Sequence, residues 1–301
     1  MNKIYVSGDK DKLHYRFSAA NTPRAYANPG DQIIFSCIDA YCNQIIDETT
    51  LFSEVNRELG NPVTGPVYIN GALPGDILKI NILSIEGADS AVMTARPNAG
   101  FFGELIPAYA SKLIPLQANK AYFNDNIVID MKPMIGVLGL ACEGSTLSTI
   151  PGEHGGNMDC KDLTAGTSVY LPVFVAGGLL SMGDLHGVQG DGETVICALE
   201  MNGTVTVTVE VLKNRSDIIT PLIVTAKNYL TLYSDSTIDL AAKGAAFKMH
   251  KFLLTHTKMT IQEIAMLISL LGNLRICQVV NPLMTCCLEF PRNLINEEIV
   301  L

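Results

Sequence analysis

The valine-rich segment that ends at Leu212 has the clearest alternation of hydrophobic and polar positions. Between residues 204 and 212 every second position is valine, and threonine or glutamate stands between the valines. A period of two puts the valines on one face of a β-strand. The preceding Asn202-Gly203 is typical of a two-residue turn. We therefore predict a hairpin between strands at 194–201 and 204–212.

The same alternation recurs near residue 80, where Leu78, Ile80 and Ile82 share one face of a predicted strand. Lys79 and Asn81 lie on its other face. Other apolar runs are bounded by turn residues, which favours buried strands. Such runs predict further strands over 31–39, 127–130 and 133–141.

The pattern changes to a helical period after residue 234. Apolar residues three and four positions apart predict helices over 236–255 and 260–271, and Gly272 fits the end of the second. Their first turns carry the residues of capping boxes, Ser236 with Asp239 and Thr260 with Glu263.

These elements predict a mainly β fold, with a sandwich or barrel-like β core and a C-terminal α/β portion. Strands predicted at 274–280 and 285–289 belong to that portion. We expect the β-rich core at residues 1–215 and the α+β portion at 216–301, packed on the core. The alternative is one intertwined domain.

Composition excludes several classes of partner. Of the 301 residues 48% are hydrophobic and 17% charged, which allows a sizeable core. A formal net charge of −9 argues against nucleic acid, because phosphates require excess Lys and Arg. The apolar runs are shorter than the ~18 residues of a spanning helix, so no membrane partner is expected. Met1–Asp9 lacks an apolar signal core. We expect a cytoplasmic protein with reduced cysteines.

Polar chemistry is concentrated at residues 151–193, on glycine-rich loops between apolar strands. Asp184 and His186 lie two positions apart, so an extended segment puts them on one side. Imidazole nitrogen and carboxylate oxygen suit Zn²⁺ or a similar ion. The alternative is a hydrogen-bonded Asp–His pair that orients a loop. Asp159 and Glu193 nearby favour a site with both a metal and a carboxylate base.

Other motifs give weaker or negative signals. Gly155-Gly156 and Gly190-Asp191-Gly192 lack the spacing of a phosphate-binding loop and do not open a helix. The chain has no EF-hand spacing and no G-x-S-x-G elbow. Asp39 ends a predicted strand, where it either caps a turn or serves a site. Cys160 follows Asp159, and we interpret it as a packed thiol.

The two central motifs, His154–Asp159 and Gly183–Glu193, resemble those of the acetamidase/formamidase family. The resemblance implies hydrolysis of a small amide to a carboxylate and ammonia, and a β-rich fold with a helical C-terminal portion. It also implies homo-oligomers, dimers or larger, and a bound divalent metal, Zn²⁺ or alternatively Ca²⁺. Cys142 departs from the proline of the family pattern. The likeness extends to Pro29-Gly30-Asp31 with Asp39, Thr64-Gly65-Pro66 with Gly71, Pro74-Gly75-Asp76, Pro133–Gly136 and Gln278–Pro282.

The main hypothesis is a metal-assisted amidohydrolase for linear amides of the formamide or acetamide class. A non-catalytic protein that binds a small ligand or metal is one alternative, because fold does not determine function. A hydrolase of a cyclic amide, such as a lactam, is the other. We predict metal ligands at Asp39, His154, Asp184 and His186, acid–base residues at Glu143, Asp159 and Glu193, and substrate-binding residues at Asn157 and Gln189.

Overall fold

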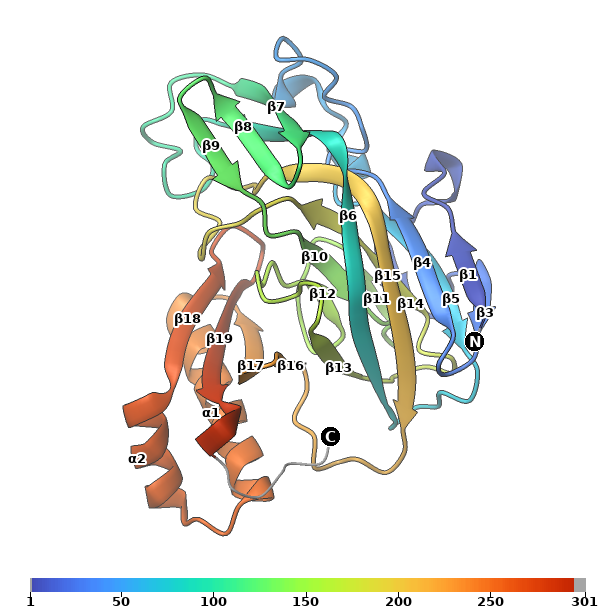
Figure 1. The fold of residues 1–301 in the computed structure, drawn as a ribbon, viewed down its shortest axis with the longest axis vertical. Coiled ribbons are helices and arrows are strands. Elements are labelled where there is room, and N and C mark those ends of the chain that lie inside the picture. Colours follow the sequence, from blue (N-terminus) through green and yellow to red (C-terminus); the bar gives the residue numbers. More distant parts are fainter. Residues whose placement is uncertain (1, 295–301) are drawn as a thin grey trace.

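The structure, a computed structural model, describes residues 2–294 (Figure 1). Strands of 3 to 19 residues precede the two α-helices, and two further strands follow the helices. The strands up to β10 are β1 (Lys3–Val6), β2 (Arg16–Ser18), β3 (Ala25–Ala27), β4 (Gln32–Cys37), β5 (Val63–Ile69), β6 (Ile77–Ala95), β7 (Ala110–Gln117), β8 (Lys120–Asn124), β9 (Ile127–Asp130) and β10 (Met134–Gly139). The later elements are β11 (Ser145–Leu147), β12 (Gly155–Asn157), β13 (Ser168–Pro172), β14 (Leu180–His186), β15 (Glu200–Leu212), β16 (Leu222–Val224), β17 (Asn228–Asp235), α1 (Ile238–His256), α2 (Ile261–Leu271), β18 (Asn273–Gln278) and β19 (Met284–Pro291).

Backbone hydrogen bonds link seventeen strands of residues 2–294 into one large sheet, and β2 and β11 form a separate pair. The long strands β6 and β15 lie side by side through the molecule (Figure 1). Strand β4 pairs with the other edge of β15, and β13 pairs with the start of β6. The inward valines of β15 are fully buried in the main hydrophobic cluster. The mainly β fold predicted from the alternating pattern is confirmed.

The hairpin predicted at Asn202-Gly203 is wrong, because β15 runs through both residues without a turn, and the strand predicted at 194–201 is also wrong, because residues 194–199 form no strand. Gly203 lies opposite Gly87 of β6, beside an irregularity in the pairing. A Cβ atom at Gly203 would lie 2.3 Å from the carbonyl oxygen of Glu86, so glycine permits the close approach of β6. Asn202 Oδ1 accepts a hydrogen bond from the backbone N–H of Asp39.

The other predicted elements are observed with shifted ends. The strand predicted at residue 78 extends as far as Ala95, because its second half pairs with β7. The Thr260–Glu263 capping box is present at the start of α2. The cap of α1 differs from the prediction: Thr237 Oγ1 accepts from the N–H of Leu240, and Ser236 hydrogen-bonds to Asp235 instead.

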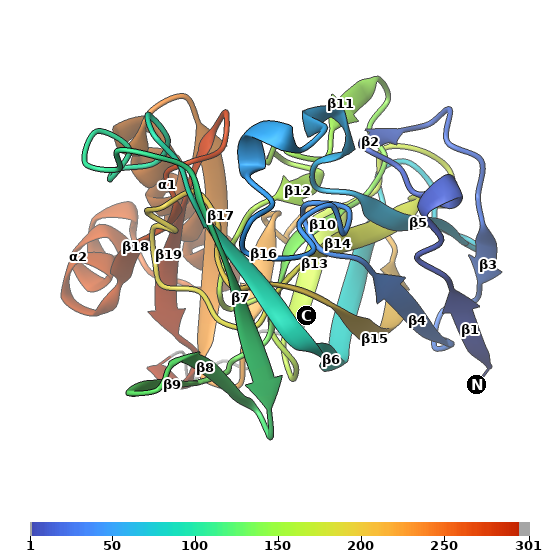
Figure 2. The same cartoon turned by 90° about the horizontal axis from the view of Figure 1, so that it is seen from above.

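Helix α1 packs against β17 and β19 and buries a stripe of apolar side chains in a second hydrophobic cluster. Ile77 and Tyr170 from the β-rich part belong to the same cluster, and β16 pairs with β13. Figure 2 shows both helices on one side of the molecule, far from β1 and β3. The boundary near residue 215 stays a prediction. Within the described residues no helix is long and apolar enough to cross a membrane.

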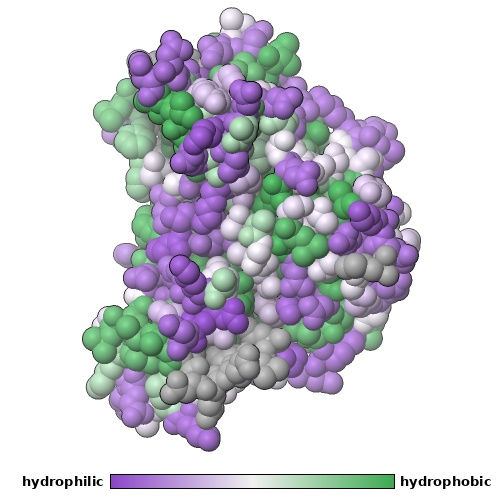
Figure 3. Space-filling view, in the orientation of Figure 1, coloured by the Kyte–Doolittle hydropathy of each residue, from purple (hydrophilic) through white to green (hydrophobic). Residues whose placement is uncertain are grey.

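Helix α2 leaves much of its apolar surface uncovered. Among its residues only Ile264 is buried, whereas Ile261, Met266 and Leu270 are 59%, 66% and 79% exposed. Figure 3 shows the corresponding hydrophobic patch at the lower left, over α2. An exposed apolar patch is typical of a surface that contacts another molecule.

We expect Gly244→Ala in α1 to destabilise the protein. Alanine favours a helix over glycine by ~1 kcal/mol. However, a Cβ at position 244 would lie 2.1 Å from Cδ1 of Tyr233, and overpacking costs about 1–3 kcal/mol. Urea unfolding should give a lower free energy for the variant. In the Tyr233→Ala background the same change should be neutral or stabilising, and an equal loss in both backgrounds would contradict the clash.

Candidate active site

His186, at the end of β14, is the centre of a group of buried polar side chains. Strand β14 pairs with β15 so that His186 lies opposite Glu200. His186 Nε2 is 3.3 Å from Glu200 Oε2 and 3.4 Å from Asp184 Oδ1. The three residues are at most 2% exposed. The register of two strands therefore builds one imidazole and two carboxylates into a single buried group.

Gly136 of β10 leaves the space in which two carboxylates meet. A Cβ atom here would lie 2.6 Å from Asp159 Oδ1 and 2.7 Å from Asp184 Oδ2. Asp159 and Asp184 have φ angles of 43° and 58°, and Glu193 has 46°. Positive φ is uncommon for residues other than glycine. Such strain persists where the surrounding structure enforces it, and it is frequent at functional sites.

Gln189 fixes the tautomer of His186. Gln189 Nε2 donates to the backbone carbonyls of Asp159 at 2.7 Å and Cys277 at 3.2 Å. Its Oε1 is therefore the atom that faces His186 Nδ1, at 2.9 Å, and it accepts a hydrogen bond from Nδ1–H. This leaves the lone pair of a neutral imidazole on Nε2, the atom beside Asp184 and Glu200. A hydrogen bond of this kind is typical of a metal-binding histidine.

Three side-chain amides orient the two aspartates. Asn61 Nδ2 donates to Asp184 Oδ2 at 2.9 Å, and Asn281 Nδ2 donates to Asp159 Oδ2 at 2.6 Å. We orient the Asn157 amide with its nitrogen toward the carboxylates, which accept but do not donate; Nδ2 is then 3.0 Å from Asp184 Oδ2 and 3.2 Å from Asp159. One oxygen of Asp184 is thus held in place, and the other stays free.

Four buried atoms of the group have no hydrogen-bond partner among residues 2–294. They are Asp184 Oδ1, His186 Nε2, Glu193 Oε2 and Glu200 Oε2. An unpaired buried polar atom costs about 1–3 kcal/mol. Burial opposes a charge on His186, but Glu200 and Asp184 outweigh it and raise the His186 pKa well above its ordinary value. Burial raises the pKa of Glu200 to about 8. The group therefore attracts a cation.

A metal ion fits this position. Asp184, His186 and Glu200 each offer one ligand atom, and these atoms lie within 4.8 Å of one another. One imidazole nitrogen and two carboxylate oxygens are a donor set that Zn²⁺ and similar ions accept. The unpaired atoms and the Nδ1–H tautomer of His186 agree with this assignment.

Asp159 and Glu193 form a second group with His186, again within 4.8 Å. Burial raises the pKa of Asp159 to about 7, and the charge of Asp184 adds to the effect. Burial and the charge of Asp159 raise the Glu193 pKa well above its ordinary value. Two carboxyl groups this close resist double ionisation, so the pair retains a proton near neutral pH. General acid–base chemistry needs a group of this kind.

A cavity of about 320 Å³ borders three of the four carboxylates around His186. Asp184, Glu193 and Glu200 line its polar end. Tyr41 and Phe52 belong to its wall, and the guanidinium groups of two other lining residues, Arg57 and Arg96, lie over the Phe52 ring.

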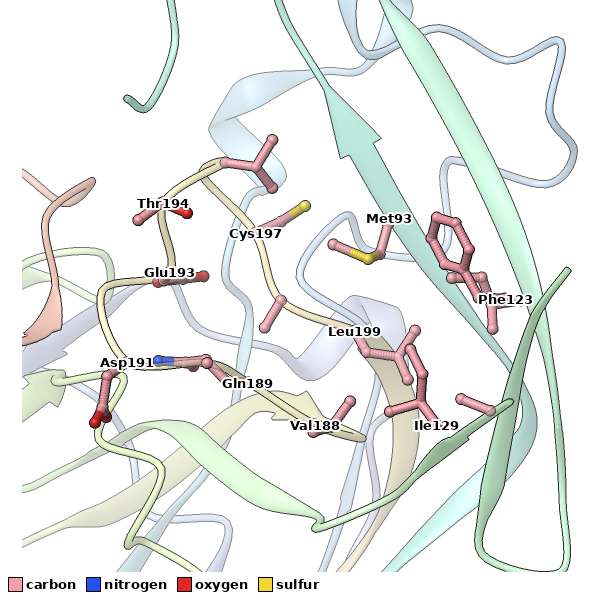
Figure 4. A pocket seen from close by; sticks show the side chains of 15 residues that line it. Met93, Phe123, Ile129, Val188, Gln189, Asp191, Glu193, Thr194, Cys197 and Leu199 are labelled. Atoms are coloured by element: carbon pink, nitrogen blue, oxygen red, sulfur yellow. The ribbon is translucent and has the colours of Figure 1, made fainter. Parts of the chain in front are cut away.

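A second cavity, of about 250 Å³, lies against the loop between β14 and β15, which carries Glu193 (Figure 4). Its walls are mostly apolar, with Met93, Phe123 and Ile129 opposite the loop that carries Gln189 and Glu193. Glu193 lines both cavities. The loop that carries it therefore separates the polar cavity from the apolar one.

The structure brings most of the predicted site residues together. Asp159, Asp184, His186, Glu193, Asn157 and Gln189 all belong to the connected group described above.

Three predicted residues lie elsewhere. Asp39 Oδ1 accepts hydrogen bonds from the backbone N–H groups of Tyr41 and Asn43, so it caps the turn after β4. The His154 ring packs edge-on against Phe17. Glu143 is exposed on the loop between β10 and β11. None of these three belongs to the groups around His186.

Glu200, Asn61 and Asn281 are members of the group that sequence reasoning missed. Glu200 interrupts the apolar run Ala198-Leu199-Glu200-Met201, and a carboxylate inside a buried strand is the signal that was available. The two asparagines gave no comparable signal, because each contacts an aspartate more than 120 positions away.

Fold and site together define a mainly β protein with a buried histidine–carboxylate centre. The family model of the Acetamidase/Formamidase family matches residues 3–147 and 140–238, and the chain belongs to this family. An acetamidase of Bacillus halodurans has the same fold, with a TM-score of 0.96, 38% identity and coverage of 99% of this chain and 100% of that one. A formamidase of Methylophilus methylotrophus is 27% identical over 280 residues, 70% of this chain and 69% of that protein. An acetamidase of Mycolicibacterium smegmatis is 28% identical over 267 residues, 66% of each.

Because His154 is buried, we expect the protein to lose stability in mild acid. Burial lowers its pKa to about 4, below the ordinary 6.5, so the unfolded chain binds more protons between these values. Stability should fall as the pH drops through that window, by about 1–2 kcal/mol between pH 7 and 5 from this residue. Urea unfolding of wild type and His154→Gln at both pH values measures it.

The variant should lose less stability than the wild type, and His250→Gln, at a half-buried position of α1 beside the carbonyl oxygen of Ile261, should behave like the wild type. Equal pH dependence in all three proteins would contradict the assignment.

Proposed function

We propose that this protein is an amidohydrolase that cleaves the C–N bond of a small linear amide and releases a carboxylate and ammonia. Family membership supports the proposal, as do relatives named formamidase and acetamidase. The observation that carries it is the buried Asp184–His186–Glu200 group, in which each residue has an unpaired atom and two of the three, Asp184 and Glu200, line a cavity. The proton-holding pair Asp159 and Glu193 lies beside that group.

The proposed metal ligands are Asp184, His186 and Glu200, with Zn²⁺ as the expected ion. When bound, the ion would polarise the amide carbonyl and lower the pKa of a water molecule. Glu200 takes a role that we had assigned to Asp39 and His154. The hydrogen bond from His186 Nδ1 to Gln189 supports this assignment, because it leaves Nε2 free for a ligand.

Proton transfer is the role that we propose for Glu193, with Asp159 as its partner. Hydrolysis must remove a proton from water and deliver one to the departing nitrogen, since NH₂⁻ is a poor leaving group. Glu193 borders the cavity and has an unpaired Oε2 atom, so its ionised form can accept the first proton and then donate it to nitrogen. Asn281 anchors Asp159, which supports a role for Asp159 in setting the proton affinity of Glu193.

The amides in the site have positioning roles in this proposal. The oxygen and the nitrogen of the Gln189 amide both form hydrogen bonds to protein atoms. We therefore propose that Gln189 orients His186 and does not contact the substrate. Asn157 lines the cavity and also donates to the aspartates, so it can orient both substrate and carboxylates.

Self-association and a cytoplasmic location remain part of the proposal. The exposed apolar residues of α2 support an association of two or more copies, because water contact with such a patch is unfavourable (Figure 3). The cytoplasmic location rests on the expectation from the sequence.

The metal assignment predicts that the purified protein carries a divalent ion, at or below one per chain. Elemental analysis should find it in the wild type and lose it in His186→Ala and Glu200→Gln, because each change removes a proposed ligand. The buried variant His154→Gln is the matched control and should retain it. A wild-type protein without metal that is fully active in chelator would refute the assignment.

The acid–base assignment predicts that Glu193→Gln abolishes ammonia release from formamide and acetamide while the fold is kept. Glutamine preserves shape but cannot accept the proton, and general acid–base help is worth ~10²–10⁴-fold in rate. Glu143→Gln, at an exposed position outside the group, is the matched control and should turn over like the wild type. The assignment fails if Glu193→Gln keeps near wild-type kcat, or if the two variants lose activity equally.

A further inference from the structure

Three cysteines meet in the interior, outside the group that we assign to amide hydrolysis. The Sγ atoms of Cys160, Cys277 and Cys287 lie within 4.8 Å of one another. The residues are 0%, 2% and 0% exposed. They come from three segments: the loop after β12, the end of β18 and the middle of β19. All are free thiols.

The fold creates this cluster at an irregularity in the β18–β19 pairing. Ile276 lies opposite Cys286, and Gln278 lies opposite Thr285, so Cys277 has no partner of its own in the ladder. The adjacent Cys286 packs under α1 instead, and its Sγ is 3.8 Å from the carbonyl oxygen of Ile238. Two neighbouring cysteines of one strand therefore have different surroundings, and only Cys287 joins the cluster.

The surroundings of the cluster favour a thiolate. Hydrogen bonds from Cys160 and Cys277 lower the pKa of Cys287 to about 5, against the effect of burial, and the charge of Arg275 adds to this. Arg275 is held by ion pairs to Asp162 at 2.9 Å and Asp191 at 3.0 Å. The convergence of three buried sulfur atoms within 4.8 Å of one another is the observation that makes the cluster a ligand set for a cation.

The number and type of donors select the ion. Three sulfur donors suit a soft ion such as Cu⁺ or Zn²⁺. The Asp162 carboxylate accepts a hydrogen bond from Cys160 at 3.9 Å, but the same oxygen is paired with Arg275 at 2.9 Å and does not join the group of three. Zn²⁺ in a closed structural site almost always takes four protein ligands. Among the described residues no fourth His, Cys, Asp or Glu atom joins this group. Three-coordinate binding favours Cu⁺.

We propose that Cys160, Cys277 and Cys287 form a three-thiolate site for Cu⁺, separate from the amide-hydrolysing centre. Binding forms three Cu–S bonds and releases the remaining thiol protons to solvent, with no change in oxidation state. The site contacts the catalytic group through the backbone. The carbonyl oxygen of Cys277 accepts from Gln189, which holds His186, and Cys160 directly follows Asp159.

The test is an anaerobic titration with Cu⁺ in the presence of a competing chromogenic chelator. Wild type should take up one tightly bound Cu⁺ per chain. We expect a large loss of Cu⁺ affinity in each of Cys160→Ser, Cys277→Ser and Cys287→Ser. The loss should exceed the ~10–100-fold that is typical when a residue hydrogen-bonded to a metal ligand is replaced. Cys286→Ser, the adjacent buried cysteine, is the matched control and should bind like the wild type. Circular dichroism checks that each variant folds.

X-ray absorption of the copper-loaded wild type gives a second readout that needs no variant. Three sulfur neighbours and no nitrogen or oxygen are expected. Equal uptake by Cys286→Ser and Cys287→Ser, nitrogen or oxygen ligands on copper, or retention of Zn²⁺ in preference to Cu⁺ would overturn the proposal. None of these results depends on amidase activity, so the outcome is independent of the proposed function.

Discussion

Four carboxylates, those of Asp159, Asp184, Glu193 and Glu200, share a buried volume with a single imidazole. Two like charges about 4 Å apart repel by about 4 kcal/mol even at an effective dielectric constant of 20. Full ionisation would therefore cost more than a protein of ordinary stability can sustain. Protons, a metal ion or both must neutralise the group. The asparagines, the Gly136 gap and the positive φ angles hold the carboxylates together against this repulsion.

Strand register is what makes such a crowded group possible. Strand β14 lies between β10 and β15, and each contributes one necessary feature. From β10 comes the glycine at which two aspartates meet, and from β15 comes Glu200. A shift of one residue in either pairing would turn the relevant side chain to the opposite face. The long β6–β15 ladder resists such a shift, because its paired residues are anchored in the main core.

Local patterns in the sequence predicted most of the elements and most of the centre. Alternating hydrophobic positions predicted strands β6 and β15, and a helical period predicted α1 and α2. These predictions hold because each pattern depends only on residues close together in the chain. Asp184 and His186 were predictable for the same reason. Glu200 was not, since its place opposite His186 depends on pairing between distant strands. The hairpin error has a similar cause: Asn202-Gly203 fits a turn, but packing against Glu86 requires the glycine in a straight strand.

Asp39 and His154 show why residue type alone misleads at a site of this kind. Both are buried and polar, as a ligand should be, yet the Asp39 carboxylate is satisfied by two backbone N–H groups. His154 Nε2 has no hydrogen-bond partner among the described residues, but the ring packs against Phe17 and lies outside the groups around His186. What distinguishes the centre is that three residues with unpaired atoms, Asp184, His186 and Glu200, bring their ligand atoms within 4.8 Å of one another. Sequence gives the donors, whereas only the three-dimensional structure reveals which of them remain unpaired.

The C-terminal portion completes the centre, although most of the polar residues lie in the β-rich part. Asn281 donates to Asp159, and the carbonyl of Cys277 fixes the amide of Gln189 that in turn holds His186. Gly192 donates to the same carbonyl and accepts from the N–H of Val279. The loop that carries Glu193 is thus hydrogen-bonded to the end of β18 and to the segment that follows it. Because these bonds cross the expected boundary near residue 215, the β-rich part cannot hold His186 and Glu193 in this geometry alone.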